Sequence, residues 1–390
     1  MTADSTHAVD RALTAMHVAS GDLWGGAESV VLELAIAQVR LGHSVHAVLF
    51  NDGLLADRLR SAGIRTTVIP ESSNGPLALL RGVRRACLDV RPDVVHSHRM
   101  KETVIGAVAA RSAAVPVCLR TVHGDNEHAL GWHQWRKGFA RIAERIASAT
   151  LLDATVAVSA ELGERLRRRR PAGRIEVIEN GIDPDRVRRE AEDHATPARA
   201  PAGAIRVGLV GRLVPVKRVD LFLDACGELA RLWGTTLEAV VVGDGPLRQD
   251  LERQAAQLRI VGTTFSGFVD NPASWIRDFD LLAITSDHEG LPMCVLEAFA
   301  LGVPVVARAV GGIPALLHDG RRGRLVDDGD ATSFAAAMKS VLDSGRRSDA
   351  NIPAVHFPPE MSIDATARRY CTLYADLIAH KKGLARGGPR

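Results

Sequence analysis

Short apolar runs alternate with longer segments of helical spacing along most of the chain, from residue 13 onward. This alternation predicts βαβ units and a parallel sheet. In the first half, the segments expected as strands are 15–19, 43–50, 65–69, 93–96, 117–122, 154–159 and 174–178. The helices expected in the same half are 26–41, 54–62, 76–90 and 101–113.

A second alternating series starts after a change in composition. Residues 184–204 are first charged and then rich in Pro and Ala, which is typical of a linker, and we place the linker at 191–204. The later strands are expected at 205–211, 238–243, 261–266, 280–285 and 303–307, and the later helices at 219–233, 250–258, 293–301 and 363–380. The pattern therefore predicts two doubly wound α/β domains, at 1–190 and 205–362, with ligands at the carboxyl ends of the strands in the cleft between the halves.

The most informative segment is 286–298, between an expected strand and an expected helix. Gly290 permits a sharp turn, and Pro292 suits the first turn of a helix. Three backbone amides would then be free to bind a phosphate group, those of Met293, Cys294 and Val295. Glu289 precedes the helix and Glu297 lies in its second turn, with seven residues between them. Either glutamate alone could be an ordinary surface acid, but the strand–loop–helix context favours a ligand site.

The loop after the strand at 205–211 carries two cations. Gly211 ends the strand, where the backbone can approach a ligand closely, and Arg212 and Lys217 project from the same loop. Two cations so placed can hold a diphosphate and offset its charge as it leaves. An exposed basic loop is the alternative, and the position at the same sheet edge as Glu289 favours the ligand site.

Two strand ends in the first half carry further candidates. Residues 20–28 follow the first strand and open a helix, and Gly25 and Gly26 suit close approach to a phosphate or another ligand. A tight turn is the alternative, and neither a G-x-G-x-x-G fingerprint nor a P-loop is present. His123 follows another expected strand and precedes Gly124, so it is either a ligand contact or a structural histidine.

In order and spacing, these segments resemble the E-x7-E signature and accompanying motifs of retaining glycosyltransferases of the GT-B fold, in particular glycosyltransferase family 4. The resemblance covers nearly the whole chain. Its shorter motifs include Gly25-Gly26-Ala27-Glu28, Val122-His123-Gly124, Asn180-Gly181-Ile182-Asp183, Gly243-Asp244-Gly245-Pro246, Gly267-Phe268 and Gly311-Gly312-Ile313-Pro314. The chain departs from the family pattern at Ala315, where the family has a glutamate, and at Phe299, which is larger than the common residue there. The resemblance therefore implies no acidic contact at position 315.

The resemblance implies two facing Rossmann-like domains, with a C-terminal helix and tail, 363–390, that pack back on the first domain. It implies that Glu297 holds ribose hydroxyls, that Glu289 holds a sugar hydroxyl, and that His123 orients the sugar. The catalytic residues that it implies are Glu289, His123, Arg212 and Lys217. The donor-binding residues are Gly25, Gly26, Arg212, Lys217, Gly243, Phe268, Val269, Glu289, Gly290, Met293, Cys294, Val295 and Glu297.

Composition and charge exclude several other classes. A net charge of +3 gives no reason to expect a nucleic-acid partner. The five cysteines are dispersed without a C-x-x-C pair, which argues against disulfides and structural zinc and favours a reducing compartment. No signal peptide and no apolar run of about 18 residues is seen, so we expect a cytoplasmic protein. No metal or other cofactor is expected, because Arg212 and Lys217 can supply the charge that Mg²⁺ would.

Two stretches in the first half are strongly basic. Residues 132–141 combine tryptophan with Arg and Lys, and 167–170 is a run of four arginines. Such segments suit an anionic membrane surface, here the inner face of the plasma membrane, or a lipid-pyrophosphate acceptor. A solvated helix face with aromatic anchors in the core is the alternative.

The predicted function is hexosyl transfer from a nucleotide-diphosphate-sugar donor to a glycan or lipid-linked acceptor, in cell-envelope or exopolysaccharide biosynthesis. Retention of anomeric configuration is implied by the resemblance alone. A nucleotide-sugar epimerase of similar shape and a non-catalytic glycan- or nucleotide-binding module are the alternatives. The glutamate pair together with Arg212 and Lys217 argues against the non-catalytic module.

Overall fold

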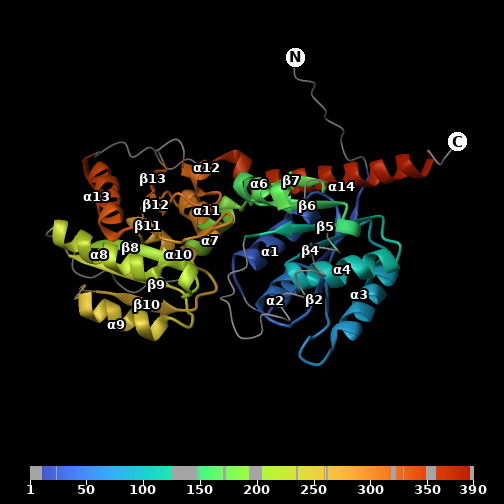
Figure 1. Cartoon of the computed structure of the whole chain (residues 1–390), viewed down its shortest axis with the longest axis horizontal. Coiled ribbons are helices and arrows are strands. Elements are labelled where there is room, and N and C mark those ends of the chain that lie inside the picture. The colour runs from blue at the N-terminus through green and yellow to red at the C-terminus, as the bar shows by residue number, and fades with distance from the viewer. Residues whose placement is uncertain are drawn as a thin grey trace, which may run out of the picture. The chain divides into compact units, whose positions relative to one another are not determined.

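The chain forms two compact units in a computed structural model (Figure 1). The structure describes residues 11–22, 24–124, 147, 149–169, 173–192, 204–233, 236–258, 260, 262–317, 322–327, 329–347 and 357–386. Unit 1 consists of residues 1–123, 130–181 and 362–390, and unit 2 consists of residues 124–129 and 182–361. Among the described residues, no helix is both long enough and apolar enough to cross a membrane.

Unit 1 is built on a seven-stranded parallel sheet of order β3-β2-β1-β4-β5-β6-β7. Its strands are β1 (Thr14–Ala19), β2 (Ser44–Leu49), β3 (Arg65–Val68), β4 (Val94–His98), β5 (Val117–Val122), β6 (Ala154–Ala157) and β7 (Ile175–Val177). Its helices are α1 (Gly26–Arg40), α2 (Leu54–Ser61), α3 (Pro76–Val90), α4 (Met100–Ser112), α6 (Ala160–Arg169) and α14 (Ile363–Arg386). The strand order reverses between β1 and β4, which makes their carboxyl ends the switch point where such sheets bind ligands.

The last helix completes the core of unit 1. Helix α14, red in Figure 1, packs against α1 and β5 although it lies at the other end of the sequence. Tyr370 and Tyr374 are fully buried there, in one apolar cluster with Leu34 of α1 and Leu119 of β5. Burial of two large aromatic side chains holds the helix on this face of the sheet.

Unit 2 repeats the architecture with a six-stranded parallel sheet of order β10-β9-β8-β11-β12-β13. Its strands are β8 (Ile205–Val210), β9 (Leu237–Val242), β10 (Thr264–Gly267), β11 (Leu281–Ile284), β12 (Val305–Arg308) and β13 (Gly323–Val326). Its helices are α7 (Pro184–Glu192), α8 (Val219–Trp233), α9 (Arg248–Leu258), α10 (Ala273–Arg277), α11 (Met293–Ala300), α12 (Ile313–Leu317) and α13 (Ala331–Arg347), with short 3₁₀ turns η1 (Pro215–Lys217) and η2 (Pro359–Met361). The order reverses between β8 and β11, so their carboxyl ends are the equivalent switch point.

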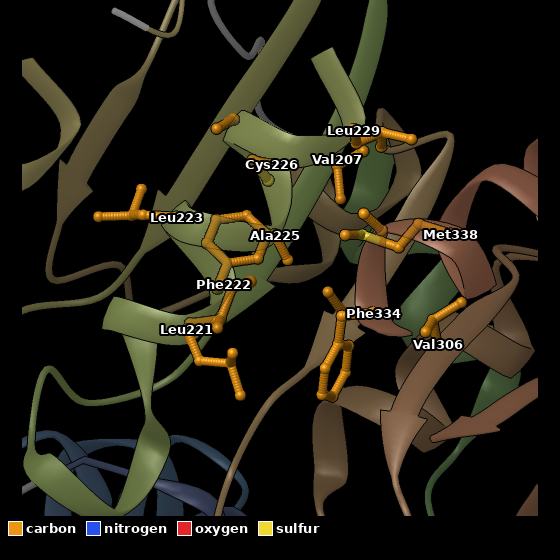
Figure 2. Packing of buried hydrophobic residues seen from close by; sticks show 14 of the residues in the cluster. Val207, Leu221, Phe222, Leu223, Ala225, Cys226, Leu229, Val306, Phe334 and Met338 are labelled. Atoms are coloured by element: carbon orange, nitrogen blue, oxygen red, sulfur yellow. The ribbon is translucent and has the colours of Figure 1, made fainter. Parts of the chain in front are cut away.

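Aliphatic and aromatic side chains from α8 and α13 fill the core of unit 2. Phe222 of α8 and Phe334 and Met338 of α13 are fully buried, together with Val207 of β8 and Val306 of β12 (Figure 2). Gly208 allows Phe279 to lie across β8, because a Cβ at this glycine would meet that ring at 2.0 Å. This core fixes the strand ends that carry the candidate ligand residues of unit 2.

The fold class expected from the sequence, two doubly wound α/β domains, is confirmed. The local assignments differ in several places. Residues 184–192 form helix α7 and belong to unit 2, so the first boundary falls at residue 181 and not at the expected 190. The amphipathic spacing of Val187 and Ala191, both buried, explains this helix within a segment whose many charges suggested a linker. Helices α6, α10, α12 and α13 and strand β13 also lie outside the segments for which the pattern predicted an element.

Candidate functional site

In unit 2, the loops that follow β8 and β11 are joined at the switch point. The backbone amide of Asp287 donates to the carbonyl of Val216 at 2.8 Å. The hydroxyl of Thr285 donates to the carbonyls of Lys217 and Arg218 at 3.1 and 2.8 Å. Because the two loops share these hydrogen bonds, the side chains that they carry are held at one place on the sheet edge.

Lys217 and Glu289, which the sequence assigned to different parts of a ligand, form an ion pair. Nζ of Lys217 lies 2.8 Å from Oε1 of Glu289, and the hydroxyl of Ser286 donates to the same oxygen at 2.7 Å. Both charged side chains are largely buried, with exposed fractions of 16% and 9%. A poorly hydrated ammonium group is a stronger partner for an anion than one in water, so this cation is suited to bind an anionic ligand at this edge.

A second cluster of charges flanks this pair. Asp287 makes ion pairs with Arg308 and, at 3.5 Å, with Arg218, and Arg218 also pairs with Asp220 at 3.0 Å. These contacts connect β12, the loop after β11 and the first turn of α8. They brace the segment that carries Glu289, a role that the sequence analysis missed.

Two glycines allow the surrounding backbone to approach this segment closely. Gly311 has φ +59°, and a Cβ there would meet the carbonyl oxygen of Glu289 at 2.0 Å, while the next residue, Gly312, donates its amide to the carbonyl of Gly290 at 2.7 Å. Gly243 has φ +142°, and a Cβ there would meet the carbonyl oxygen of Gly211 at 2.0 Å. A side chain at Gly243 or Gly311 would therefore displace the strand-end loops.

Helix α11 begins at Met293, directly after Pro292, as expected. One detail of the sequence prediction is wrong: the amide of Val295 is not free, because it donates to the carbonyl of Pro292 at 3.2 Å. A first turn that tightens in this way uses one of the amides that helix starts usually leave open. The side chains of Met293 and Val295 are buried, so any ligand contact here would come from the amides of Met293 and Cys294. Burial raises the pKa of the Cys294 thiol, which makes this cysteine a poor nucleophile.

The remaining candidates of unit 2 lie at or near the same edge. Arg212 is exposed in the loop after β8, and Glu297 is partly buried in α11. Phe268 follows β10 and exposes 57% of its surface, with Val269 partly buried beside it. An exposed phenyl ring at a strand end offers a flat apolar face of the kind on which a planar ligand can stack.

In unit 1, an ion pair between a buried glutamate and an exposed arginine holds the segment after β1. Gly25 is the N-cap of α1 and its carbonyl accepts from the amide of Ser29 at 2.9 Å, while Gly26 starts the helix. Glu28, in the first turn, is buried and lies 2.5 Å from Nη2 of Arg99, just beyond β4. Arg99 has φ +89°, an unfavourable conformation for a residue with a side chain, and its ion pair helps to hold that backbone in place.

His123 lies at the end of a row of hydrogen-bonded histidines. Its Nε2 is 3.1 Å from Nδ1 of His98, and Nε2 of His98 is 3.0 Å from Nδ1 of His17. His17 continues to Oε1 of Gln38 at 2.8 Å. Burial lowers the pKa of His17 and of His123 to about 4 and that of His98 well below its ordinary value, so all three are neutral at pH 7.

A fourth histidine, His96, lies beside this row. Its Nδ1 is 2.7 Å from the hydroxyl of Tyr374, and its Nε2 is 2.7 Å from that of Thr121. One ring nitrogen from each of His17, His96 and His98 lies within 4.8 Å of the others, close enough to hold a metal ion. All six nitrogens of these three rings already have hydrogen-bond partners, so the arrangement is complete as a neutral polar network.

Sequence reasoning identified His123 but missed the histidines behind it. The available signal was the placement of histidines on adjacent strands: β1 and β4 pair in register at His17 and His96, and His98 lies two residues further along β4. Residues two apart in a strand share a face, so this pattern could have indicated the cluster. Gln38 carried no such signal, because it lies on helix α1 and no strand register relates it to these histidines.

Comparison with known proteins agrees with this architecture. Residues 204–344 match the family model described as glycosyl transferases group 1, and residues 24–186 match the model described as glycosyltransferase family 4. The glycosyltransferase EpsF of Bacillus subtilis is 29% identical over 304 residues, which cover 75% of this chain and 78% of EpsF. D-inositol 3-phosphate glycosyltransferase 2 of Catenulispora acidiphila is 29% identical over 309 residues, which cover 75% of this chain and 72% of that enzyme.

A solved structure gives the same result for the fold. The crystal structure of Anabaena HepE in complex with UDP-glucose aligns with a TM-score of 0.69 at 21% identity, over 96% of this chain and 98% of HepE. Both halves of the chain match glycosyltransferase models, the relatives are glycosyltransferases, and the fold is GT-B. The chain therefore belongs to the group 1 glycosyltransferases, enzymes of the hexosyltransferase class.

Proposed function

We propose that this enzyme transfers a hexosyl group from a nucleotide-diphosphate-sugar to a glycan or lipid-linked acceptor, with retention of the anomeric configuration. The observation that carries the proposal is the buried Lys217–Glu289 pair at the switch point of unit 2, 2.8 Å from Nζ to Oε1. A cation there meets the diphosphate, and the carboxylate beside it accepts a hydrogen bond from a sugar hydroxyl. HepE, a structural neighbour, was crystallised with UDP-glucose, which makes this the first donor to test.

The other residues of unit 2 complete the proposed donor site. Arg212 and the amides of Met293 and Cys294 add donors for the phosphate oxygens, and Glu297 accepts from the ribose hydroxyls. Gly243, Phe268 and Val269 flank the base. In unit 1, Gly25, Gly26 and His123 are proposed to contact the transferred part of the donor.

The proposed reaction needs no protein nucleophile. The acceptor hydroxyl attacks the anomeric carbon on the face that the diphosphate leaves, and the departing phosphate oxygen takes the hydroxyl proton. The C–O bond to the phosphate breaks as the new glycosidic bond forms, so configuration is retained. Lys217 and Arg212 stabilise the negative charge that grows on the leaving group. Stabilisation of developing charge is usually the largest single contribution to catalysis. For this reason we also propose that the reaction proceeds without a metal ion.

The acceptor is proposed to belong to the cell envelope or to an exopolysaccharide, reached at the inner face of the plasma membrane. Arg167, Arg168 and Arg169 are exposed on α6 of unit 1, and each basic group near an anionic surface contributes about 1 kcal/mol. Arg167 is partly occupied, since it pairs with Glu164 at 2.8 Å. Arg170 and the basic stretch at 132–141 lie outside the described residues.

The proposal is tested with purified protein and a panel of nucleotide sugars. Thermal shift identifies the donor that binds, and donor consumption is then followed with and without candidate glycan or lipid-linked acceptors. We expect consumption that depends on acceptor, a product whose anomeric coupling in NMR matches that of the donor, and unchanged transfer after dialysis against EDTA.

Each other outcome has a definite meaning. Conversion of the donor sugar to its epimer without acceptor would make the enzyme an epimerase. Donor binding without any turnover across the panel would favour a non-catalytic module. A product of inverted configuration would contradict retention, and activity lost on chelation and restored by Mn²⁺ or Mg²⁺ would contradict the metal-free reaction.

A further inference from the structure

In the row formed by His17, His98 and His123, each hydrogen bond has a defined donor and acceptor. These roles are set by Gln38, at the end of the row farthest from His123. A carbonyl oxygen only accepts hydrogen bonds, so the contact between Oε1 of Gln38 and Nε2 of His17, 2.8 Å, requires the proton on that nitrogen. A neutral imidazole carries one N–H, so Nδ1 of His17 must accept, and His98 must donate from Nε2. By the same step, Nδ1 of His98 accepts from Nε2 of His123.

The end of the row is an unused acceptor. With its proton on Nε2, His123 has a lone pair on Nδ1, and this atom is buried with no hydrogen-bond partner among the described residues. A buried acceptor of this kind requires a hydrogen-bond donor, and a ligand can bring one. A hydroxyl group supplies such a donor.

The amide of Gln38 is itself oriented by α14. Its Nε2 donates to the hydroxyl of Tyr374 at 3.4 Å, and Tyr374 in turn donates to Nδ1 of His96 at 2.7 Å. His96 then donates from Nε2 to Thr121 at 2.7 Å. Rotating the Gln38 amide by half a turn would exchange donor and acceptor in every hydrogen bond from Gln38 to His123 and from Gln38 to Thr121. Nδ1 of His123 would then become a donor.

We propose that Gln38 is a positioning residue that fixes the tautomers of His17, His98 and His123 in series, so that Nδ1 of His123 accepts a hydrogen bond from a hydroxyl of the bound sugar. The identity of that ligand rests on the proposed function, whereas the tautomer order does not. The row thereby selects a hydroxyl donor at this position and disfavours a ligand that offers only an acceptor there.

The direct test is histidine-selective nitrogen-15 NMR of the full-length protein, because protonated and bare ring nitrogens have separate shifts. Comparison with His123→Asn assigns the His123 signals. In the native protein we expect Nδ1 of His123 to be bare and Nε2 protonated. A proton on Nδ1 of His123 would overturn the proposal.

Two variants at Gln38 separate tautomer control from packing. Gln38→Met keeps the length of the side chain but removes the acceptor, and we expect mixed tautomers at His123 and a fall in kcat/KM of about tenfold, the value of one ordinary hydrogen bond. Gln38→Glu restores an acceptor and should restore both the native tautomer and most of the activity. The matched control is Gln254→Met in unit 2, which also loses amide hydrogen bonds, to Asp220 and Asp224, but touches no histidine.

The remaining results also decide the matter. Native tautomers in Gln38→Met would show that Gln38 does not set the order. Stoichiometric uptake of Zn²⁺ that His17→Asn abolishes would make His17, His96 and His98 a metal site. It would overturn the proposal that Gln38 fixes the histidine tautomers. If NMR shows the expected tautomers but His123→Asn retains full kcat/KM, the relay stands and the proposed sugar contact fails.

Discussion

The two units carry the same strand order around their switch points but differ in the side chains placed there. In unit 1, the Glu28–Arg99 ion pair lies beside a row of buried histidines, which are neutral because burial lowers their pKa. In unit 2, they carry charges: Lys217 with Glu289, and Asp287 with Arg218 and Arg308. A neutral polar network suits uncharged hydroxyl groups, whereas paired cations suit phosphates, so the fold supplies the place and the side chains supply the chemistry.

Catalytic activity should be most sensitive to single substitutions at the switch point of unit 2. Lys217→Met removes the ammonium group that we assign to the leaving diphosphate, and we expect kcat/KM to fall roughly 100-fold to 1000-fold. Steady-state kinetics with saturating acceptor measures this loss. Lys339→Met is the matched control, because Lys339 also forms an ion pair, with Asp343 at 2.6 Å, but on α13. Equal activities of the two variants would rule out the assigned role.

For unit 1, which carries the buried histidines, we expect instead that the free energy of unfolding depends on pH. The pKa of His17 is about 4 in the folded state and 6.5 in the unfolded state, so between these values the unfolded chain binds a proton that the folded chain does not. The free energy of unfolding should therefore decrease as the pH is lowered through this range, by about 3 kcal/mol at pH 4 from His17 alone. Amide hydrogen exchange of β1 reports this for unit 1. A pH dependence of β1 exchange that is no shallower in His17→Asn would contradict the expectation.

A substitution in unit 2 that affects donor binding alone should have a smaller effect. Glu297→Ala removes the proposed contact to the ribose and should weaken nucleoside diphosphate binding by about 1.5–3 kcal/mol, the usual value of a hydrogen bond to a charged group. Isothermal calorimetry measures the affinity, and circular dichroism checks that the fold is intact. An unchanged affinity would remove Glu297 from the donor site.

The smallest effect concerns the outer surface of unit 1. Replacing Arg168 and Arg169 with Gln should weaken sedimentation with anionic liposomes by about 2 kcal/mol at low salt. Replacing Arg84 and Arg85, which are exposed on α3 of the same unit, is the control for general loss of charge. Equal losses in both variants, or no binding by the native protein, would remove the specific membrane role of α6.

How far the sequence predicts this molecule differs between the fold and the site. Apolar runs with turn residues at their ends predicted the sheets well, because a parallel strand is buried on both faces and therefore reads as a short apolar run. Helix α7 was missed because its charges resemble a linker and its buried face consists only of Val187 and Ala191. Local composition could not show that this face is covered within unit 2.

The site divides in the same way. Motif spacing singled out Glu289 and Lys217 separately, but only the folded loops bring their charged atoms to 2.8 Å. The amide of Val295 was expected to be free, and the tight first turn of α11 closed it. The histidine row depends on Gln38 and Tyr374, whose positions follow from packing of α1 and α14 on the sheet and not from any local pattern.

The diphosphate is assigned to the switch point of unit 2 and not to that of unit 1. The most direct test of this assignment is hydrogen exchange of the full-length protein with and without saturating nucleoside diphosphate. The account predicts slower exchange in residues 211–217 and 285–297 of unit 2, where the charged loops and the start of α11 lie. The histidine-bearing strands of unit 1 should show no comparable change. Protection confined to unit 1, with 211–217 and 285–297 unaffected, would contradict the assignment of the diphosphate to the Lys217–Glu289 pair.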